Sequence, residues 1–258
     1  MHIIKRELSA DFSELYIMVF ADEHIGDPLS NKPALKARIE KVRTTPNLYA
    51  ILNGDLMNNA TKTSVSDSYA ETLSPQQQLD MLVELFTPIK DKILCIAPGN
   101  HEHRTYIKEG IDITAILASR LGLLDYYAPT AAYMFLRFGQ DVKNHRSQKL
   151  IYTFYITHGR RAGRTAGAKI NALMGLRNIV DADVYIHSHS HIPAVLKQPR
   201  HKVDVQHGKV TACDALFVNT AANLEYGGYG ETFEFEPASM KTPTIHLSGR
   251  YKEADGRV

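Results

Sequence analysis

The stretch Pro98-Gly99-Asn100-His101-Glu102-His103 follows directly after an apolar run at residues 93–97. Such a run is typical of a buried strand. Ligands of α/β proteins bind outside the carboxyl ends of strands, so this stretch lies where chemistry is expected. Asn100 offers a neutral oxygen to a metal ion, and His101 can donate a proton near neutral pH. The stretch therefore predicts an α/β fold with a reactive site at a strand end.

Four other short strands are expected to end in residues that bind metals. The run at 16–21 leads into Asp22-Glu23-His24. Residues two apart on an extended strand point the same way, so Asp22 and His24 are expected to face one site. The runs at 48–52, 150–157 and 184–186 lead in the same way to further candidate ligands: Asp55, His158, His189 and His191.

The candidate ligands are carboxylates, imidazoles and one amide: Asp22, His24, Asp55, Asn100, His158, His189 and His191. This mixed set suits divalent first-row metals of intermediate hardness and not a thiolate zinc site. Seven ligands are more than one ion needs, whereas two metals that share one carboxylate would use them all. Paired metals about 4 Å apart are the usual means of in-line displacement at phosphorus.

The order of the expected elements indicates a sheet with parallel neighbours. A helix at 33–43 separates the first two strands, and a second helix at 75–89 precedes the strand at 93–97. Residues 59–74 are rich in Ser, Thr and Ala, and they form either a lid over the site or a solvated connection. Further helices are expected at 111–121 and up to 180, and further strands at 131–138, 194–197, 209–218 and 244–247.

Length and composition agree with one soluble α/β domain that spans residues 1–258. Apolar residues make up 44% of the chain and charged residues 22%, as in ordinary globular proteins. The formal charge of +2 excludes an extended basic surface, so any basic binding surface is local.

The two cysteines and the first residues bear on the compartment. Cys95 and Cys213 lie in apolar or strand-like surroundings and are expected to be reduced thiols in the core. Lys5, Arg6 and Glu7 stand where a secretory signal would need an apolar run, and no segment is long and apolar enough to span a membrane. We expect a cytoplasmic protein that does not enter a membrane.

The ordered motifs Asp-x-His, Gly-Asp, Gly-Asn-His-Glu, His-Gly and His-x-His, between residues 16 and 193, resemble those of the calcineurin-like metallophosphoesterase superfamily. The glycine-punctuated basic loop after His158 and the segment Tyr226-Gly227-Gly228-Tyr229 are similar to small stand-alone phosphoesterases of bacteriophages and prophages. The resemblance implies a four-layer αββα sandwich of two mixed β-sheets flanked by helices, with a dimetal site at the carboxyl-terminal rims of the strands.

The resemblance also implies a role for each motif residue. Asp55 would bridge the two metals, and His101 would protonate the leaving oxygen or steady the phosphate. The remaining ligands divide into a first metal set, Asp22, His24 and His191, and a second metal set, Asn100, His158 and His189. Manganese is the first candidate for both ions, and Fe, Zn, Ni and Mg are the alternatives.

Two departures from the family pattern refine this interpretation. Ser188 stands where the family usually has glycine, which leaves open the register of three alternate histidines. His189 and His191 are the favoured pair, and His187 is expected to lie behind the ligands or in the core. The segment Leu56-Met57-Asn58-Asn59 replaces the Asp-Arg-Gly continuation of protein Ser/Thr phosphatases and argues against that branch, despite the shared Glu102.

Four further side chains are candidates for gripping the substrate phosphate: His103, Arg160, Arg161 and Arg164. Guanidinium groups bind phosphate through paired hydrogen bonds. The alternative is a solvated basic turn at the start of a helix. Glu102 and Arg104 could likewise touch phosphate or only cap the loop, and Tyr226 and Tyr229 could stack a base or pack a strand edge.

The sequence thus predicts a metal-dependent hydrolase of phosphodiesters. A hydroxide held between two divalent ions would attack phosphorus, and the expected substrate is DNA, RNA or a nucleotide. The alternatives are a phosphomonoesterase that acts on nucleotides or small phosphates, and a catalytically silent metal-binding interaction module. A homo-oligomer is compatible with the sequence.

Overall fold

Two mixed β-sheets form the centre of the structure, a computed structural model that describes residues 2–61, 64, 68–142, 148–160 and 163–258. The five-stranded sheet has the order β11-β10-β2-β3-β4, in which the strands are Ala254–Arg257, Thr244–Ser248, Glu14–Phe20, Leu48–Asn53 and Ile93–Ala97. The six-stranded sheet has the order β1-β5-β6-β7-β9-β8, in which the strands are His2–Glu7, Ala132–Phe138, Leu150–Ile156, Val184–His187, Lys209–Asn219 and Ala194–Asp204.

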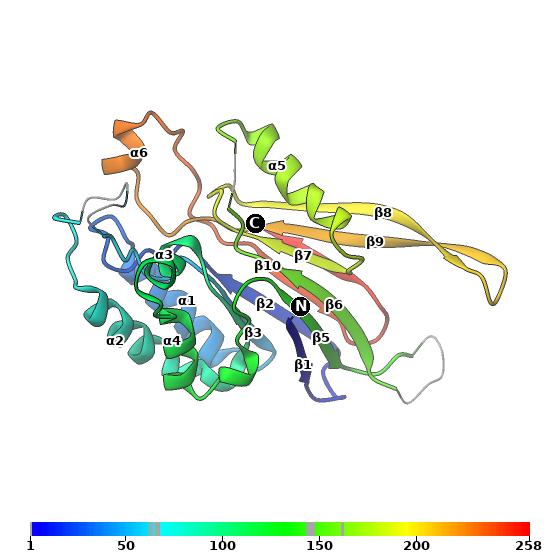
Figure 1. Cartoon of the computed structure of the whole chain (residues 1–258). Helices are drawn as coiled ribbons and strands as arrows, with labels where there is room; N and C mark the ends of the chain where they lie inside the picture. Colours follow the sequence, from blue (N-terminus) through cyan, green and yellow to red (C-terminus); the bar gives the residue numbers. More distant parts are fainter. Residues whose placement is uncertain (1, 62–63, 65–67, 143–147, 161–162) are drawn as a thin grey trace.

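Helices cover the outer face of each sheet (Figure 1). The helices on the five-stranded sheet are α1, α2 and α4, at Lys32–Thr44, Pro75–Phe86 and Ile113–Leu121. Helix α5, Ala166–Gly175, lies on the six-stranded sheet, and the short helices α3 and α6 span Asn100–Glu109 and Gly228–Thr232. Short segments of 3₁₀ helix lie at Thr87–Lys92, Leu124–Tyr126 and Leu176–Asn178.

Three apolar clusters fix the order of these layers. The first lies between the sheets and contains Ile17 and Phe154. The second joins the five-stranded sheet to its helices through Phe20 and Leu82, and the third places Tyr185 under α5. Buried apolar side chains therefore occur on both faces of each sheet, as central strands of an α/β protein require. The predicted αββα sandwich of two mixed sheets is confirmed.

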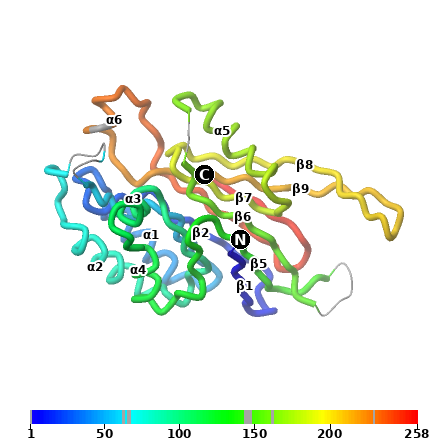
Figure 2. The backbone as a smooth tube through the Cα atoms, viewed as in Figure 1, coloured from blue at the N-terminus to red at the C-terminus, as the bar shows by residue number. Residues whose placement is uncertain are grey.

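Several elements differ from the sequence prediction. Helix α3 begins at Asn100 itself, so the central motif opens a helix and not a loop. Strands β8 and β9 each have 11 residues and form a ribbon that extends past the rest of the sheet (Figure 2). Strands β1 and β11 were not predicted, because their alternating exposure leaves no continuous apolar run.

The remaining expectations have separate outcomes. Cys95 is buried between the sheets as predicted, but Cys213 is half-buried because it lies on the ribbon.

Within the described ranges, no helix is long and apolar enough to cross a membrane. The assignment of residues 1–258 to one domain and the cytoplasmic location stay predictions. The loop at 59–74 lies partly outside the described residues, so the choice between a lid and a solvated connection stays a prediction. In its described part, Glu71 accepts hydrogen bonds from Asn58 Nδ2 and Ala60 N.

Candidate metal centre

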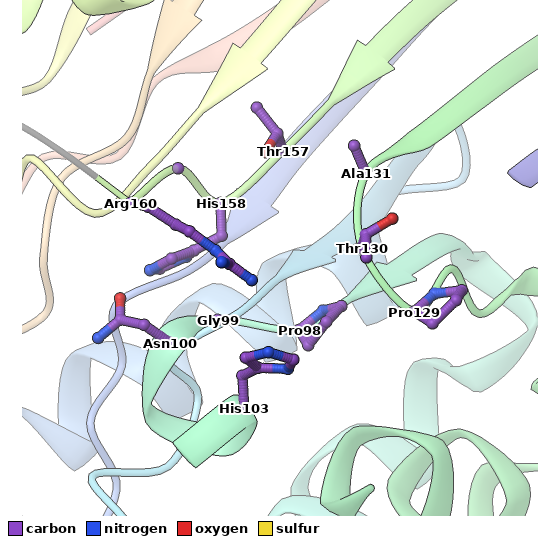
Figure 3. Close-up of a pocket in the computed structure, with 11 residues that line it drawn as sticks. Pro98, Gly99, Asn100, His103, Pro129, Thr130, Ala131, Thr157, His158 and Arg160 are labelled. Atoms are coloured by element: carbon purple, nitrogen blue, oxygen red, sulfur yellow. The ribbon is translucent and has the colours of Figure 1, made fainter. Parts of the chain in front are cut away.

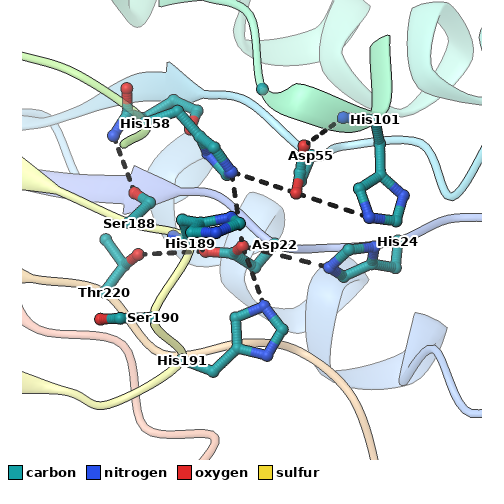
Figure 4. Close-up of polar contacts among 12 residues, drawn as sticks. Asp22, His24, Asp55, His101, His158, Ser188, His189, Ser190, His191 and Thr220 are labelled. Atoms are coloured by element: carbon teal, nitrogen blue, oxygen red, sulfur yellow. Dashed lines mark hydrogen bonds and ion pairs between the residues drawn. The ribbon is translucent and has the colours of Figure 1, made fainter. Parts of the chain in front are cut away.

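The candidate site lies where strands of both sheets end. Strand β2 pairs in parallel with β3, and β6 pairs in parallel with β7, so each pair ends at one edge of its sheet. The segments after these four strands carry Asp22, Asp55, His158 and His189, whose side chains converge in Figure 4. Because the two sheets pack face to face, the site draws side chains from both.

Left-handed backbone conformations direct these side chains to the centre. The angle φ is 53° at Asp22, 46° at His24, 48° at Asp55, 65° at His189 and 56° at His191. Each such residue costs about 1–3 kcal/mol, and such strain gathers at functional sites. A turn after β2, and not the alternation of an extended strand, therefore brings Asp22 and His24 to one place.

The first cluster consists of Asp22, His24 and His191, whose candidate ligand atoms lie within 4.8 Å of one another. His191 Nε2 is 3.1 Å from Asp22 Oδ1, and His24 Nε2 is 4.0 Å from the same oxygen. Asp22 is fully buried and His24 is nearly so. Both nitrogens of His24 lack a hydrogen-bond partner among the described residues.

The second cluster consists of Asp55, His158 and His189, again within 4.8 Å. His158 Nε2 lies 3.0 Å from Asp55 Oδ2 and 3.8 Å from Asp22 Oδ1, so it connects the two clusters. The shorter contact lacks hydrogen-bond geometry, and His158 Nε2 and Asn100 Oδ1 are both buried without such a partner in the described part of the chain. Buried polar atoms without partners are costly, and a divalent cation would satisfy these two atoms by taking them as ligands. The residues present therefore fit such cations.

His101 lies at the edge of the two clusters. Its Nδ1 is 2.6 Å from the carbonyl oxygen of Asn58, and since a carbonyl only accepts, Nδ1 carries the proton. Its Nε2 then faces the site, 3.8 Å from Asp55 Oδ2, and its ring lies 4.5 Å from that of His24. His24, Asp55 and His101 form a third group of candidate ligand atoms. The position allows His101 to act either on the substrate or on a cation.

Burial and mutual charge shift the pKa values of the site. Burial raises the pKa of Asp22 and of Asp55, but the neighbouring imidazoles outweigh burial and hold both values low, that of Asp22 at about 2. Burial lowers the pKa of His24 to about 3 and, together with His158, that of His189 to about 4. Burial also disfavours charge on His158, yet Asp55 and Asp22 raise its pKa to about 10. Ionised carboxylates and neutral imidazoles are the states that bind cations, so His158 would release its proton when a cation binds.

Glu102 positions the loop that carries Asp55. It is buried and accepts three backbone hydrogen bonds of 3.0 Å, from Asp55 N, Met57 N and Gly99 N. Burial and the charge of Asp55 raise the pKa of Glu102, and the N–H of Met57 opposes them. A Cβ atom at Gly99 would stand 2.0 Å from Asp55 Oδ1, so the close approach of these loops requires glycine. Glu102 had two predicted roles, touching phosphate or capping the loop, and its three hydrogen bonds to the backbone favour the second.

His187 lies behind the site and belongs to none of the three groups. Its Nδ1 is 2.8 Å from Asn219 Oδ1, and a Cβ atom at Gly159 would stand 2.2 Å from its Nε2. Ser188, in place of the family's glycine, accepts a 2.7 Å hydrogen bond from Asn53 Nδ2. These contacts connect the ends of β3, β7 and β9.

The candidate phosphate-binding residues separate in space. His103 and Arg160 line a cavity beside the second cluster (Figure 3). Arg164 instead donates to the carbonyl oxygen of Phe233 at 2.8 Å and lies over the ring of Phe235. Arg161 is outside the described residues. The role of all four in substrate binding stays a prediction.

The sequence analysis missed the segment that follows β9. Thr220 Oγ1 donates to Asp22 Oδ2 at 3.4 Å, and Asn223 N donates to the carbonyl oxygen of Asp22 at 2.9 Å. The segment therefore holds the turn that carries Asp22. Its signal in the sequence was a polar pair, Asn219-Thr220, directly after an apolar run, which is the pattern of the other strand ends.

Fold and site together define a mixed α/β protein with metal-ligand clusters at the strand ends. The sequence model of the calcineurin-like phosphoesterases matches residues 15–193. The chain belongs to this family. It is thus a phosphoesterase-family protein of the kind that uses divalent metals. No curated protein shows significant sequence similarity to it.

The solved structures that match the chain are distant from it in sequence. A predicted phosphoesterase from Streptococcus pneumoniae is 11% identical, with a TM-score of 0.38 over 95% of this chain and 98% of the other. A metallophosphoesterase from Sphaerobacter thermophilus is 14% identical, with a TM-score of 0.39 over 91% and 83%. A Vps29 single mutant from Entamoeba histolytica is 11% identical, with a TM-score of 0.40 over 94% and 98%.

Proposed function

We propose that the protein hydrolyses phosphodiesters of a nucleic acid or nucleotide at a site that holds two divalent cations. The observation that carries the proposal is the contact between the two clusters. His158 Nε2 lies within 3.8 Å of carboxylate oxygens from both Asp55 and Asp22, so two sets of ligands adjoin one another. Adjoining sets of this kind suit paired cations on either side of one phosphate.

The proposed ligand sets keep Asp55 between them. Asp22, His24 and His191 hold the first cation, and Asn100, His158 and His189 hold the second. Asp55 faces both sets, since its carboxylate belongs to the second cluster and also to the group with His24. When bound, the cations, with manganese as the first candidate, lower the pKa of a water molecule and neutralise phosphate charge.

His101 is proposed to give the leaving oxygen its proton. The carbonyl oxygen of Asn58 holds Nδ1, which turns Nε2 toward the site. A positioned imidazole is an effective proton donor in general acid catalysis. The main-chain N–H of His101 also donates a 2.8 Å hydrogen bond to Asp55 Oδ1. The segment after β3, which contains Asp55 and Asn58, therefore contacts both the main chain and the ring of the proposed proton donor.

The test is metal-restored hydrolysis of model esters. Protein stripped by a chelator is assayed on bis-p-nitrophenyl phosphate and on p-nitrophenyl phosphate, with Mn, Mg, Zn or Ni added singly. Cleavage of the diester supports the proposal. Cleavage of the monoester alone would favour a phosphomonoesterase, and bound metal without any turnover would favour a silent interaction module.

Two substitutions separate the proposed roles. Asp55→Asn is expected to weaken binding of both cations and to abolish turnover. His101→Ala is expected to retain both cations and, on a dinucleotide whose leaving alkoxide needs a proton, to lose about 10²–10⁴-fold in rate, the usual contribution of a general acid. His201→Ala, on the distant ribbon, is the matched control. Full activity of His101→Ala would contradict the proposed proton donor.

A further inference from the structure

A cavity of about 300 Å³ opens beside the second cluster (Figure 3). Asn100 and His158, two of the proposed ligands, form one of its walls. This volume lies at the lower end of the range for small-molecule sites, about 300–1,000 Å³. The cavity therefore admits one nucleoside or a group of that size.

His101, the proposed proton donor, is not among the residues that line the cavity. Asn100 and His158 line the cavity, whereas His101 does not, because its ring packs against His24 of the first cluster. In an in-line displacement the leaving oxygen departs toward the proton donor. A group in the cavity is consequently not the leaving group but the substituent that remains on phosphorus.

The lining of the cavity combines flat apolar surfaces with a few polar groups. Pro98, Pro129 and Ala131 supply the apolar surface, and Thr130 and Thr157 supply hydroxyls. This combination is typical of sites for small organic ligands.

Two further side chains complete the lining. The ring of His103 stacks on Tyr106, with centroids 5.5 Å apart and planes 25° apart, which fixes its orientation. Arg160 extends along the cavity, where its guanidinium can stack on a ring or donate to phosphate (Figure 3). Flat surfaces and hydrogen-bonding groups match a base and its sugar.

We propose that this cavity binds the nucleoside that stays attached to phosphorus. The inference rests on the proposed function and names its substrate as a diester that carries a nucleoside on the retained side. Water forms the new P–O bond, the P–O bond to the leaving group breaks, and the leaving oxygen takes its proton from His101. The product is a nucleoside monophosphate, and a monoester has no retained substituent to fill the cavity.

The test uses probes that share one leaving group. The p-nitrophenyl ester of thymidine 5′-monophosphate keeps thymidine on phosphorus, and methyl p-nitrophenyl phosphate keeps only a methyl group. Both release p-nitrophenol, so their chemistry is comparable. We expect kcat/KM for the thymidine probe to exceed that for the methyl probe about tenfold or more, since binding of a remote group accelerates the reaction. The 3′-monophosphate ester reports the preferred attachment.

The decisive variant is Thr130→Phe, which places an aromatic ring in the cavity at an exposed position. It is expected to reduce the ratio of the two kcat/KM values to near one, while Thr211→Phe, at an exposed position on the ribbon, leaves the ratio unchanged. His103→Leu is a second variant that should lower the ratio if Thr130→Phe does not fold.

The outcomes separate this inference from the function beneath it. A ratio near one in the parent protein, or a high ratio that both cavity variants preserve, would overturn the nucleoside site and leave the phosphoesterase proposal standing. Hydrolysis of neither probe with any metal would overturn both.

Discussion

Glu102→Gln removes one charge from a buried position without changing the size of the side chain. In the parent protein the two carboxylate oxygens accept from the backbone N–H groups of Asp55, Met57 and Gly99, each at 3.0 Å. A glutamine has only one oxygen. Its best placement keeps the oxygen near Asp55 and Gly99, so its amide group then faces the N–H of Met57 and two donors oppose each other.

The magnitude follows from these contacts. A hydrogen bond to a charged acceptor contributes about 1.5–3 kcal/mol, and a buried donor left unpaired costs about 1–3 kcal/mol. The lost bond to Met57, together with the two weakened bonds, predicts a decrease of about 2–3 kcal/mol in the free energy of unfolding. For a chain of this size, that decrease lowers the midpoint of thermal unfolding by about 5–10 °C.

The assay is thermal unfolding of parent and variant in the presence of a chelator, so that bound metals do not add stability. Glu109→Gln, at an exposed position on the same helix, is the matched control and should change the free energy by no more than about 0.5 kcal/mol. If the midpoints of Glu102→Gln and Glu109→Gln agree within about 2 °C, the shift that roughly 1 kcal/mol or less produces in a chain of this size, the positioning role of Glu102 is refuted.

Three further predictions concern stability and metal binding. Burial raises the pKa of Cys95 from 9.0 to about 12, so between these two pH values the thiol ionises only in the unfolded chain. The free energy of unfolding should therefore fall by up to about 1.4 kcal/mol per pH unit above pH 9. Urea unfolding of the parent protein and of Cys95→Ala, which lacks this dependence, measures the difference. Gly99→Ala should lose manganese affinity in calorimetry, whereas Gly167→Ala, whose added Cβ meets nothing within 4 Å, should bind normally. Arg38→Met leaves the buried carboxylate of Glu23 without its 2.6 Å ion pair and should lower the free energy of unfolding by about 3–5 kcal/mol. Equal stability of the parent protein and Arg38→Met would exclude a structural role for the ion pair between Arg38 and Glu23.

Short-range patterns predicted an α/β fold and the candidate ligands, whereas the αββα sandwich was implied by the resemblance of the ordered motifs to the calcineurin-like phosphoesterases. Apolar runs such as residues 48–52 identified central strands, since these are buried on both faces. The polar residues directly after each run identified the strand ends. The parallel pairing of β2 with β3 placed Asp22 beside Asp55, and the face-to-face packing of the two sheets added His158.

Other features depend on contacts that no local pattern contains. The start of α3 at Asn100 was missed because glycine at its N-terminus does not have a capping side chain, and Glu102 takes that function by accepting from Gly99 N. The contact of Thr220 with Asp22 joins residues 198 apart in the chain. The left-handed turns at the ligands were likewise not predicted, because positive φ is uncommon even for aspartate and histidine, which adopt it more often than other non-glycine residues.

The most direct test of the central claim is the position of bound manganese in crystals of the protein, measured by anomalous diffraction. The account predicts two peaks about 4 Å apart. One should lie against Asp22, His24 and His191, the other against Asn100, His158 and His189, and Asp55 should touch both. A single peak, or a pair that Asp55 does not join, would contradict the shared dimetal site on which the proposed function depends.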